Sequence, residues 1–124
     1  MHIVNRKDSK ILNTPQGSEI RLLMDRTVSA ISQCSLAEEI LPPGKTVPRH
    51  HHEVLEEIYY ILSGSGEMTV GDETKNVGSG DAIFIPKNHV HSLTNTGDKE
   101  MKLLLVCGPA FYFEDHKLEE QKKK

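Results

Sequence analysis

The sequence predicts an all-β protein, built as an antiparallel sandwich or barrel. Seven short segments rich in β-branched, aromatic and other apolar residues recur along the 124-residue chain. Clusters of Gly, Pro, Asn, Asp and Ser separate these segments, and helix-like sequence appears only near the C-terminus. Strands separated by such turns at roughly 8–12-residue spacing are typical of antiparallel sandwiches and barrels.

The expected elements follow one another without an internal repeat. Residues 1–18 are mixed and polar and end in a Pro-Gln-Gly turn, which predicts an N-terminal arm before the first strand. A β-domain is expected over residues 19–113, with strands at 20–24, 30–41, 57–62, 67–70, 82–85, 90–94 and 102–107. Residues 114–124 are the expected C-terminal segment, with a short helix over 114–120 and then a solvated tail.

Composition and charge exclude several classes of protein. With 36% hydrophobic and 27% charged residues, the chain is expected to be globular rather than disordered. Fifteen Lys and Arg against 18 Asp and Glu leave a net charge of −3, too balanced for a nucleic-acid partner. No apolar run approaches the roughly 20 residues that span a membrane, and no signal-peptide pattern opens the chain. We therefore expect a cytoplasmic protein in which Cys34 and Cys107 are buried, reduced thiols.

Five of the seven histidines fall into two clusters, His50-His51-His52 and His89-Val90-His91. If residues 49–53 are extended, successive side chains alternate between faces, so His50 and His52 share one face. His51 then points away, outward or toward a subunit boundary. The first cluster therefore offers two ring nitrogens on one side of a strand.

Glu57 lies on the same face of a later strand as the apolar residues Tyr59 and Ile61. A buried carboxylate without a partner is costly, and a divalent metal is one such partner. His91 is placed so that its strand can present it opposite the first cluster. Three imidazoles and one carboxylate suit Mn²⁺, Fe²⁺, Ni²⁺, Co²⁺ or Zn²⁺. Such binding is expected to weaken below about pH 6, because imidazoles with a pKa of about 6.5 must first lose their protons.

The spacing of these residues resembles the two sequence motifs of the cupin family. The first motif, G-x5-H-x-H-x3,4-E-x6-G, is matched in full by Gly44, His50, His52, Glu57 and Gly64. The second, G-x5-P-x-G-x2-H-x3-N, is matched by Gly80, Pro86, His91 and Asn95. Asn88 stands where the family usually has glycine, and Asn tolerates left-handed backbone better than other residues with a side chain. The two motifs cover residues 44–95, and the rest of the chain agrees in strand pattern only.

The resemblance implies a jelly-roll-type antiparallel β-barrel that holds one divalent transition metal per chain. The ligands it implies are His50, His52, Glu57 and His91. Four protein ligands on a six-coordinate metal leave two positions for water, dioxygen or a bidentate substrate. The expected function is a metal-dependent enzyme, of the dioxygenase or isomerase type, that acts on a small oxygenated metabolite. The alternative is a non-catalytic cupin that binds a sugar or another small ligand.

The remaining expectations concern partners and neighbouring residues. We expect a homodimer, because a small barrel exposes edge strands and the first 30 residues can add a strand to a neighbour. Tyr59 either hydrogen-bonds a substrate or, the simpler reading, belongs to the core. Asn95 is expected to satisfy backbone groups in its turn. His89 is placed equally well at the barrel mouth or in a turn, and His2 and His116 are assigned no function.

Overall fold

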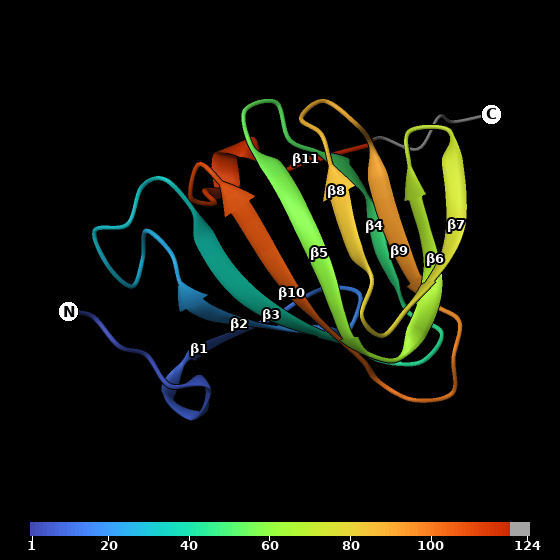
Figure 1. Cartoon of the computed structure of the whole chain (residues 1–124), viewed down its shortest axis with the longest axis horizontal. Helices are drawn as coiled ribbons and strands as arrows, with labels where there is room; N and C mark the ends of the chain where they lie inside the picture. The colour runs from blue at the N-terminus through green and yellow to red at the C-terminus, as the bar shows by residue number, and fades with distance from the viewer. Residues whose placement is uncertain (120–124) are drawn as a thin grey trace.

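The computed structural model describes residues 1–119 as two antiparallel β-sheets (Figure 1). The six-stranded sheet contains, in spatial order, β1 (Lys10–Asn13), β2 (Glu19–Met24), β3 (Ser35–Leu41), β10 (Met101–Gly108), β5 (Glu56–Ser63) and β8 (Ala82–Ile85). The five-stranded sheet contains β11 (Lys117–Leu118), β4 (Thr46–His51), β9 (His91–Asn95), β6 (Ser65–Val70) and β7 (Glu73–Gly78). Two 3-10 turns, η1 (Arg6–Asp8) and η2 (Phe113–Asp115), complete the described chain. Within these residues, no helix has the length and apolar character needed to cross a membrane.

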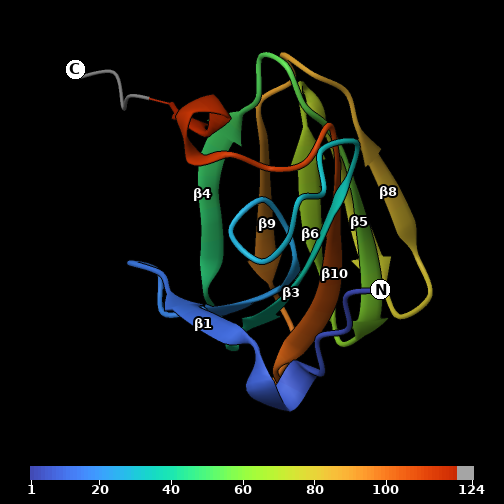
Figure 2. The same cartoon turned by 90° about the vertical axis from the view of Figure 1, so that its left-hand side faces the viewer.

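The chain passes back and forth between the two sheets, which is the connectivity of a jelly roll. β3 lies in the six-stranded sheet, β4 in the five-stranded sheet and β5 again in the first, and the alternation continues to β10. Figure 2 shows the two sheets from the side, with β4 and β9 facing β10 and β5. The predicted all-β, jelly-roll-type architecture is confirmed. Within residues 1–119 no pairing joins β7 to β8, so the barrel is open along that edge.

All seven predicted strands are present, but the structure adds four others and moves several strand ends. The strand predicted at 30–41 begins only at Ser35, because Asp25 holds the preceding loop. Oδ1 of Asp25 accepts hydrogen bonds from the backbone N (2.8 Å) and the hydroxyl (2.6 Å) of Thr27. The added strands β1, β4, β7 and β11 are short or largely polar. β7, for example, contains no buried residue, so no apolar alternation marks it in the sequence.

The secondary structure of the N-terminal and C-terminal segments differs from the prediction, and so does the exposure of Cys34. The arm predicted over residues 1–18 contains β1, which pairs with β2. The helix predicted over 114–120 is replaced by η2 and β11, because β11 adds to the free edge of β4 and a helix this short is marginal alone. Residue 120 and the predicted tail lie outside the described residues. Cys34 is exposed in the loop before β3, whereas Cys107 is buried as expected.

The core lies between the sheets and is formed by the inward side chains of both. β5 alternates strictly, so that Glu57, Tyr59 and Ile61 are buried while Ile58 and Tyr60 are exposed. The other members of the core cluster are Leu41, Val47, Met68, Ile85, Leu93, Met101 and Leu103. The metal-ligand candidate Glu57 therefore shares its face with core residues, as the strand alternation predicted.

Asn95 closes the turn after β9, as predicted from its position in the second motif. Its Nδ2 donates hydrogen bonds to the backbone oxygens of Leu41 and Lys99, both at 2.8 Å. Its Oδ1 accepts a hydrogen bond from the backbone N of Gly97 at 3.0 Å. The side chain is fully buried and ties three backbone segments together. Asn95 is a structural residue. It ends β9, whereas His91 begins that strand, so the two side chains lie at opposite ends of β9.

A second carboxyl group, that of Glu39 on β3, is buried inside the fold at 2% exposure. The Ser18 hydroxyl donates a hydrogen bond to its Oε2 at 2.6 Å. Burial raises the pKa of Glu39 from 4.5 to about 7, and the charge of Glu57 adds to this, while the bond from Ser18 opposes it. Glu39 therefore keeps its proton in the folded protein over a pH range in which the unfolded chain has lost it.

We expect Glu39 to make the protein less stable as pH rises. Because the folded state binds the extra proton, the free energy of unfolding falls as pH increases between the two pKa values. The loss attributable to Glu39 is on the order of 2–3 kcal/mol between about pH 5 and about pH 8. Urea unfolding of the wild type and of Glu39→Gln across this range measures it as the difference between the two curves. Parallel curves would contradict the prediction.

Candidate metal centre

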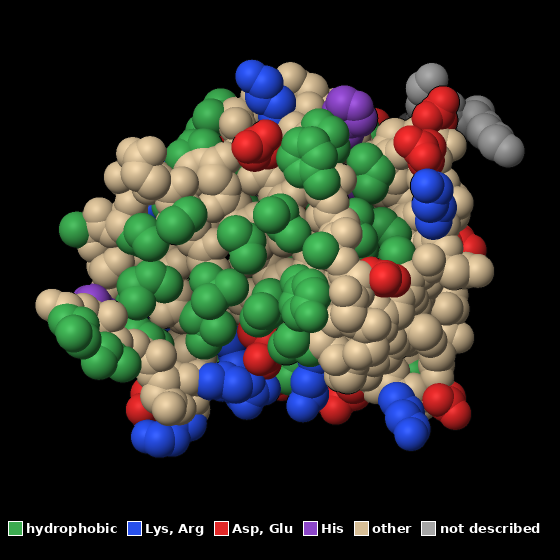
Figure 3. All heavy atoms as spheres, in the orientation of Figure 1, with side chains coloured by type: hydrophobic (Ala, Val, Ile, Leu, Met, Phe, Trp, Pro, Cys, Tyr) green, Lys and Arg blue, Asp and Glu red, His purple; other side chains and the backbone are tan. Residues whose placement is uncertain are grey.

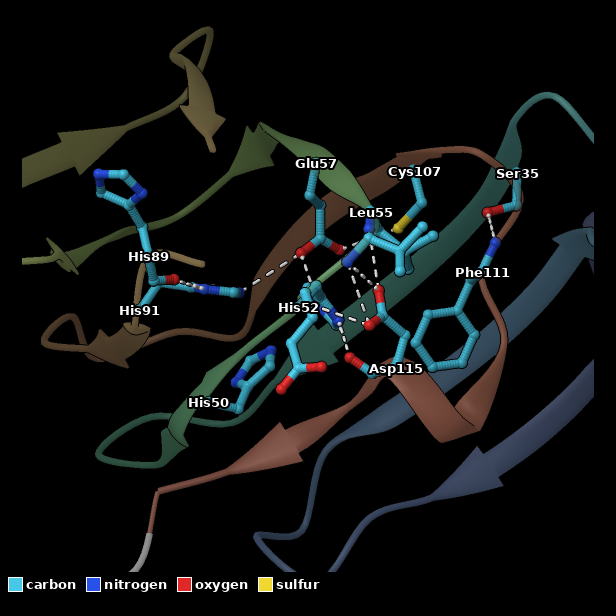
Figure 4. Close-up of polar contacts among 12 residues, drawn as sticks. Ser35, His50, His52, Leu55, Glu57, His89, His91, Cys107, Phe111 and Asp115 are labelled. Atoms are coloured by element: carbon cyan, nitrogen blue, oxygen red, sulfur yellow. Dashed lines mark hydrogen bonds and ion pairs between the residues drawn. The ribbon is translucent and has the colours of Figure 1, made fainter. Parts of the chain in front are cut away.

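The structure brings together all four side chains that the motifs single out. Donor atoms of His50, His52, Glu57 and His91 all lie within 4.8 Å of one another. All four residues are buried, with exposures from 1% for His91 to 6% for Glu57. They come from β4, the loop after it, β5 and β9, and they point toward one another between the two sheets (Figure 4). Four donors from three strands and one loop thus share one water-poor site.

Strand register explains most of this convergence. His50 on β4 lies directly opposite His91 on β9, and their ring centroids are 4.1 Å apart. Glu57 faces them from β5 in the other sheet, where its register partner on β10 is Cys107. The Cys107 thiol donates a hydrogen bond to Oε2 of Glu57 at 3.4 Å. His52 differs from the other three because it lies just beyond the end of β4 and belongs to no strand.

The hydrogen bonds of the three rings fix which nitrogen faces the site. Nδ1 of His50 lies 2.8 Å from the backbone oxygen of Pro48, and Nδ1 of His91 lies 3.0 Å from that of His89. Nδ1 of His52 lies 2.8 Å from the backbone oxygen of Asp115. A carbonyl oxygen can only accept, so Nδ1 carries the hydrogen in each ring. In the neutral rings, Nε2 then holds a free lone pair, which is what a metal requires.

The polar atoms at the centre of the site lack a partner in the protein. Oε1 of Glu57 lies 3.4 Å from Nε2 of His52 and 3.4 Å from Nε2 of His91. Among the described residues, neither Oε1 of Glu57 nor Nε2 of His91 has a hydrogen-bond partner, although both are buried. A carboxylate oxygen and a ring lone pair repel one another unless a cation lies between them. The four residues therefore fit a single metal ion, which would be held through three nitrogens and one oxygen.

The pKa values of two of these groups favour the forms that bind metal. Burial lowers the pKa of His50 from 6.5 to about 3, and its neighbour His91 lowers it further, so the ring is neutral. Burial alone would raise the pKa of Glu57, but the nearby rings of His52 and His91, each with Nε2 3.4 Å from Oε1, lower it to about 2. Neither group needs to lose a proton before a metal binds near neutral pH.

His52 behaves differently, and it predicts the pH dependence of metal binding. Burial lowers its pKa, but the adjacent carboxylate of Glu57, 3.4 Å from Nε2, outweighs burial, so the pKa is raised from its usual 6.5. A proton and a metal then compete for Nε2, and affinity falls as pH drops through this raised value rather than only below about pH 6. We expect metal binding to release a proton from His52 at pH values near and below its raised pKa. Co²⁺ titrations at several pH values measure this release, and an affinity independent of pH would contradict it.

Sequence reasoning missed two residues at this site, His116 and Asp115. The ring of His116 stacks on that of His50, with centroids 4.4 Å apart and planes 26° apart. Asp115 accepts the hydrogen bond from His52 described above. Asp115 ends η2 and His116 follows it, far from either motif, and no spacing in the sequence relates them to the histidine clusters. Only the path of the C-terminal segment over β4 brings them here.

The other residues near the clusters lie outside the site. His51 points away from it and lies 3.6 Å from a carboxylate oxygen of Glu119. His89 and Glu56 are exposed. Tyr59 is 2% exposed and packs in the core, where burial raises its pKa well above 10. The core reading of Tyr59 is therefore the one that the structure favours.

A cavity of about 600 Å³ opens along the edge where β7 and β8 remain unpaired. Its inner wall includes Met68, Val70, Val77 and Ile83, and its rim includes His89. Val70 lies directly opposite His91 in the register of β6 and β9, so their side chains are neighbours on the inner face. Ile83 is likewise opposite Tyr59. The cavity therefore borders the side of the site on which His91 lies.

Comparison with known proteins agrees with the motifs and with this geometry. A family model described as "Cupin domain" matches residues 37–107, more than half of the chain. The chain belongs to the cupin family. The match includes both motifs and β3 to β10, and so contains all four candidate ligands of this cupin.

The names of proteins similar to this cupin indicate different functions. An uncharacterised protein of Methanocaldococcus jannaschii is 40% identical over 102 residues, which cover 82% of each chain. The oxalate-binding protein of Thermotoga maritima is 39% identical over 66 residues, 53% of this chain and 54% of that protein. The solved structure of the polyketide cyclase RemF from Streptomyces resistomycificus has a TM-score of 0.73 and 29% identity, over 93% of this chain and 89% of that one. The family thus includes relatives named as binding proteins and as enzymes.

Proposed function

We propose that this cupin is a metal-dependent enzyme that acts on a small oxygenated metabolite. The observation that carries the proposal is the set of four buried donors, His50, His52, Glu57 and His91, with Nε2 lone pairs directed at one point. A site that supplies only four ligands to a six-coordinate metal would leave two positions for a substrate. When bound, the metal would polarise a substrate oxygen as a Lewis acid or, if redox-active, support oxygenase chemistry.

The chain's own residues would bind and orient the substrate. The cavity between β7 and β8 has the size of a small-molecule site, and both apolar and charged residues line it. A substrate with two neighbouring oxygens, such as a hydroxy acid, an enediol or a diketone, would place both on the free metal positions. Burial of the four ligands keeps bulk water from the reacting oxygens. The ligand set suits reactions of both the dioxygenase and the isomerase type.

The second candidate is a cupin that captures such a ligand without transforming it. The similarity to the oxalate-binding protein of Thermotoga maritima favours it, since oxalate also presents two neighbouring oxygens. Both candidates share the metal and the class of ligand. They differ only in whether a bond in the ligand changes.

One experiment separates the two candidates. Untagged protein is loaded with Mn²⁺, Fe²⁺, Ni²⁺, Co²⁺ or Zn²⁺ and incubated with hydroxy acids, enediols, diketones and oxalate. Thermal unfolding reports binding, because a ligand of the folded state raises the midpoint, and mass spectrometry reports product. Product that His52→Ala does not form supports the enzyme. Stabilisation without product across the whole panel supports the binding protein and contradicts the enzyme.

We also propose that the protein is a homodimer that pairs through the outer face of the six-stranded sheet. Figure 3 shows hydrophobic side chains gathered over this face, and Ile58 and Phe84 are 43% and 58% exposed. A cavity of about 310 Å³ next to this face is lined by Ile58 and Phe84, and also by the buried Glu57 and Cys107. Apolar surface of this extent on a small domain marks an interface. A monomeric mass at micromolar concentration, or an unchanged dimer in Phe84→Lys, would contradict the proposal.

The cytoplasmic location expected from the sequence is also a proposal. It is supported by Cys34 and Cys107, which are both free thiols. Unpaired thiols are typical of reducing compartments. Thiol trapping in whole cells, with both cysteines found reduced, is the expected result.

A further inference from the structure

The segment that follows β10 returns across the candidate metal centre, and we call residues 111–119 the C-terminal strap. It begins where the backbone N of Phe111 donates a hydrogen bond to the Ser35 hydroxyl at 2.9 Å. It continues as β11, in which Lys117 pairs with His51 of β4. It ends where the backbone N of Glu119 donates a hydrogen bond to the Arg49 oxygen at 3.0 Å. The strap therefore lies along the edge of the strand that carries His50.

Asp115 is the residue through which the strap is attached to the site. Its side chain is 2% exposed, yet it forms no ion pair with Lys or Arg among the described residues. Instead, Oδ1 accepts a hydrogen bond from the backbone N of Glu53 (2.9 Å), and Oδ2 accepts one from that of Leu55 (2.8 Å). The backbone N of Val54 lies 3.2 and 3.1 Å from the two oxygens. One carboxylate thus satisfies three consecutive backbone donors of a single loop (Figure 4).

That loop is the connection between two candidate ligands, His52 and Glu57. His50, Glu57 and His91 are each held by the pairing of the strand in which they lie. His52 lies outside any strand, so no sheet register fixes its ring. Among the described residues, Nδ1 of His52 forms its hydrogen bond with the backbone oxygen of Asp115, at 2.8 Å. The same residue therefore holds the loop with its side chain and the ring with its main chain.

We propose that Asp115 is a positioning residue for the metal centre: its carboxylate fixes the loop from Glu53 to Leu55, which follows His52, and so sets the orientation of the His52 ring. This inference rests on the proposed metal-dependent function. It assigns the C-terminal strap, which lies outside both cupin motifs, a role in ligand geometry. Partners that orient a metal-binding histidine typically change metal affinity by about 10- to 100-fold when they are removed.

The test compares Co²⁺ binding in four purified, untagged proteins: wild type, Asp115→Ala, Asp115→Asn and the control Asp25→Ala. Asp25 is a matched control because it is also a buried carboxylate that accepts loop hydrogen bonds, but it does so after β2. Affinity is measured by titration. The visible absorption spectrum of bound Co²⁺ reports the ligand geometry, which a merely structural role would not alter. Far-ultraviolet circular dichroism confirms that each protein is folded.

We expect Asp115→Ala to bind Co²⁺ about 10- to 100-fold more weakly and with a changed spectrum. Asp115→Asn keeps one acceptor oxygen and should lie between Asp115→Ala and the wild type, while Asp25→Ala should match the wild type in both measurements. Folded Asp115→Ala with wild-type affinity and spectrum would overturn the inference alone. If Asp115→Ala does not fold, the same result in Asp115→Asn overturns it. Wild type that binds neither Co²⁺ nor any of the other four candidate metals would overturn both this inference and the proposed function.

Discussion

Replacement of His52 by alanine is expected to abolish tight binding of a divalent metal and any turnover that depends on it. The change removes one of four ligands and leaves Oε1 of Glu57 facing an empty space. Loss of an outer-shell partner already costs up to about 100-fold in metal affinity, so loss of a ligand should cost at least about that much. Titration with Co²⁺ or Zn²⁺ measures the effect directly.

The run of three histidines contains its own control. His51 lies next to His52 in the chain but points away from the site, toward Glu53 and Glu119. His51→Ala should therefore bind metal with an affinity within a few-fold of the wild type. If both variants lose affinity equally, the histidine run acts through its overall charge or through folding. If neither does, His52 is not a ligand.

Gly64→Ala is expected to have the largest effect on stability among single changes at the motif glycines. Gly64 joins β5 to β6 with φ = 96°, and an added Cβ would lie 2.9 Å from the Cα of Met101. Left-handed backbone costs a residue with a side chain about 1–2 kcal/mol, and overpacking against rigid backbone adds about 1–3 kcal/mol. We expect a total loss of roughly 2–5 kcal/mol in the free energy of unfolding, measured by urea denaturation of metal-free protein.

Gly44 separates the two contributions to this cost. Its φ of 76° is also left-handed, but no heavy atom lies within 4 Å of the position its Cβ would take. Gly44→Ala should therefore lose only the backbone contribution, about 1–2 kcal/mol. Equal losses in the two variants would show that the contact between Gly64 and β10 has no energetic weight.

The parts of the site that lie in strands could be predicted from the sequence because strand geometry has a period of two. That period places His50 and His52 on one side of the chain and Glu57 among core residues, and the structure places them so. Asn88, which stands at a usual glycine position, has the left-handed φ of 64° that its position in the motif predicted. In these segments, local sequence and tertiary structure agree.

The C-terminal strap could not be predicted, because its structure depends on groups far away in the sequence. Asp115 and the loop it holds are separated by about sixty positions, and no periodicity connects them. Locally, residues 114–120 resemble a short helix, but the unpaired edge of β4 offers backbone hydrogen bonds that favour β11 instead. The same reason applies to His116, whose position over His50 follows from the path of the strap.

Metal content of the purified protein tests the central claim most directly. Protein produced without a histidine tag is exposed in turn to Mn²⁺, Fe²⁺, Ni²⁺, Co²⁺ and Zn²⁺, freed of excess ions by dialysis and examined by elemental analysis. The lone pairs of three Nε2 atoms and the carboxylate of Glu57 predict close to one ion per chain for at least one of these metals. Folded wild-type protein that retains none of the five would contradict the account.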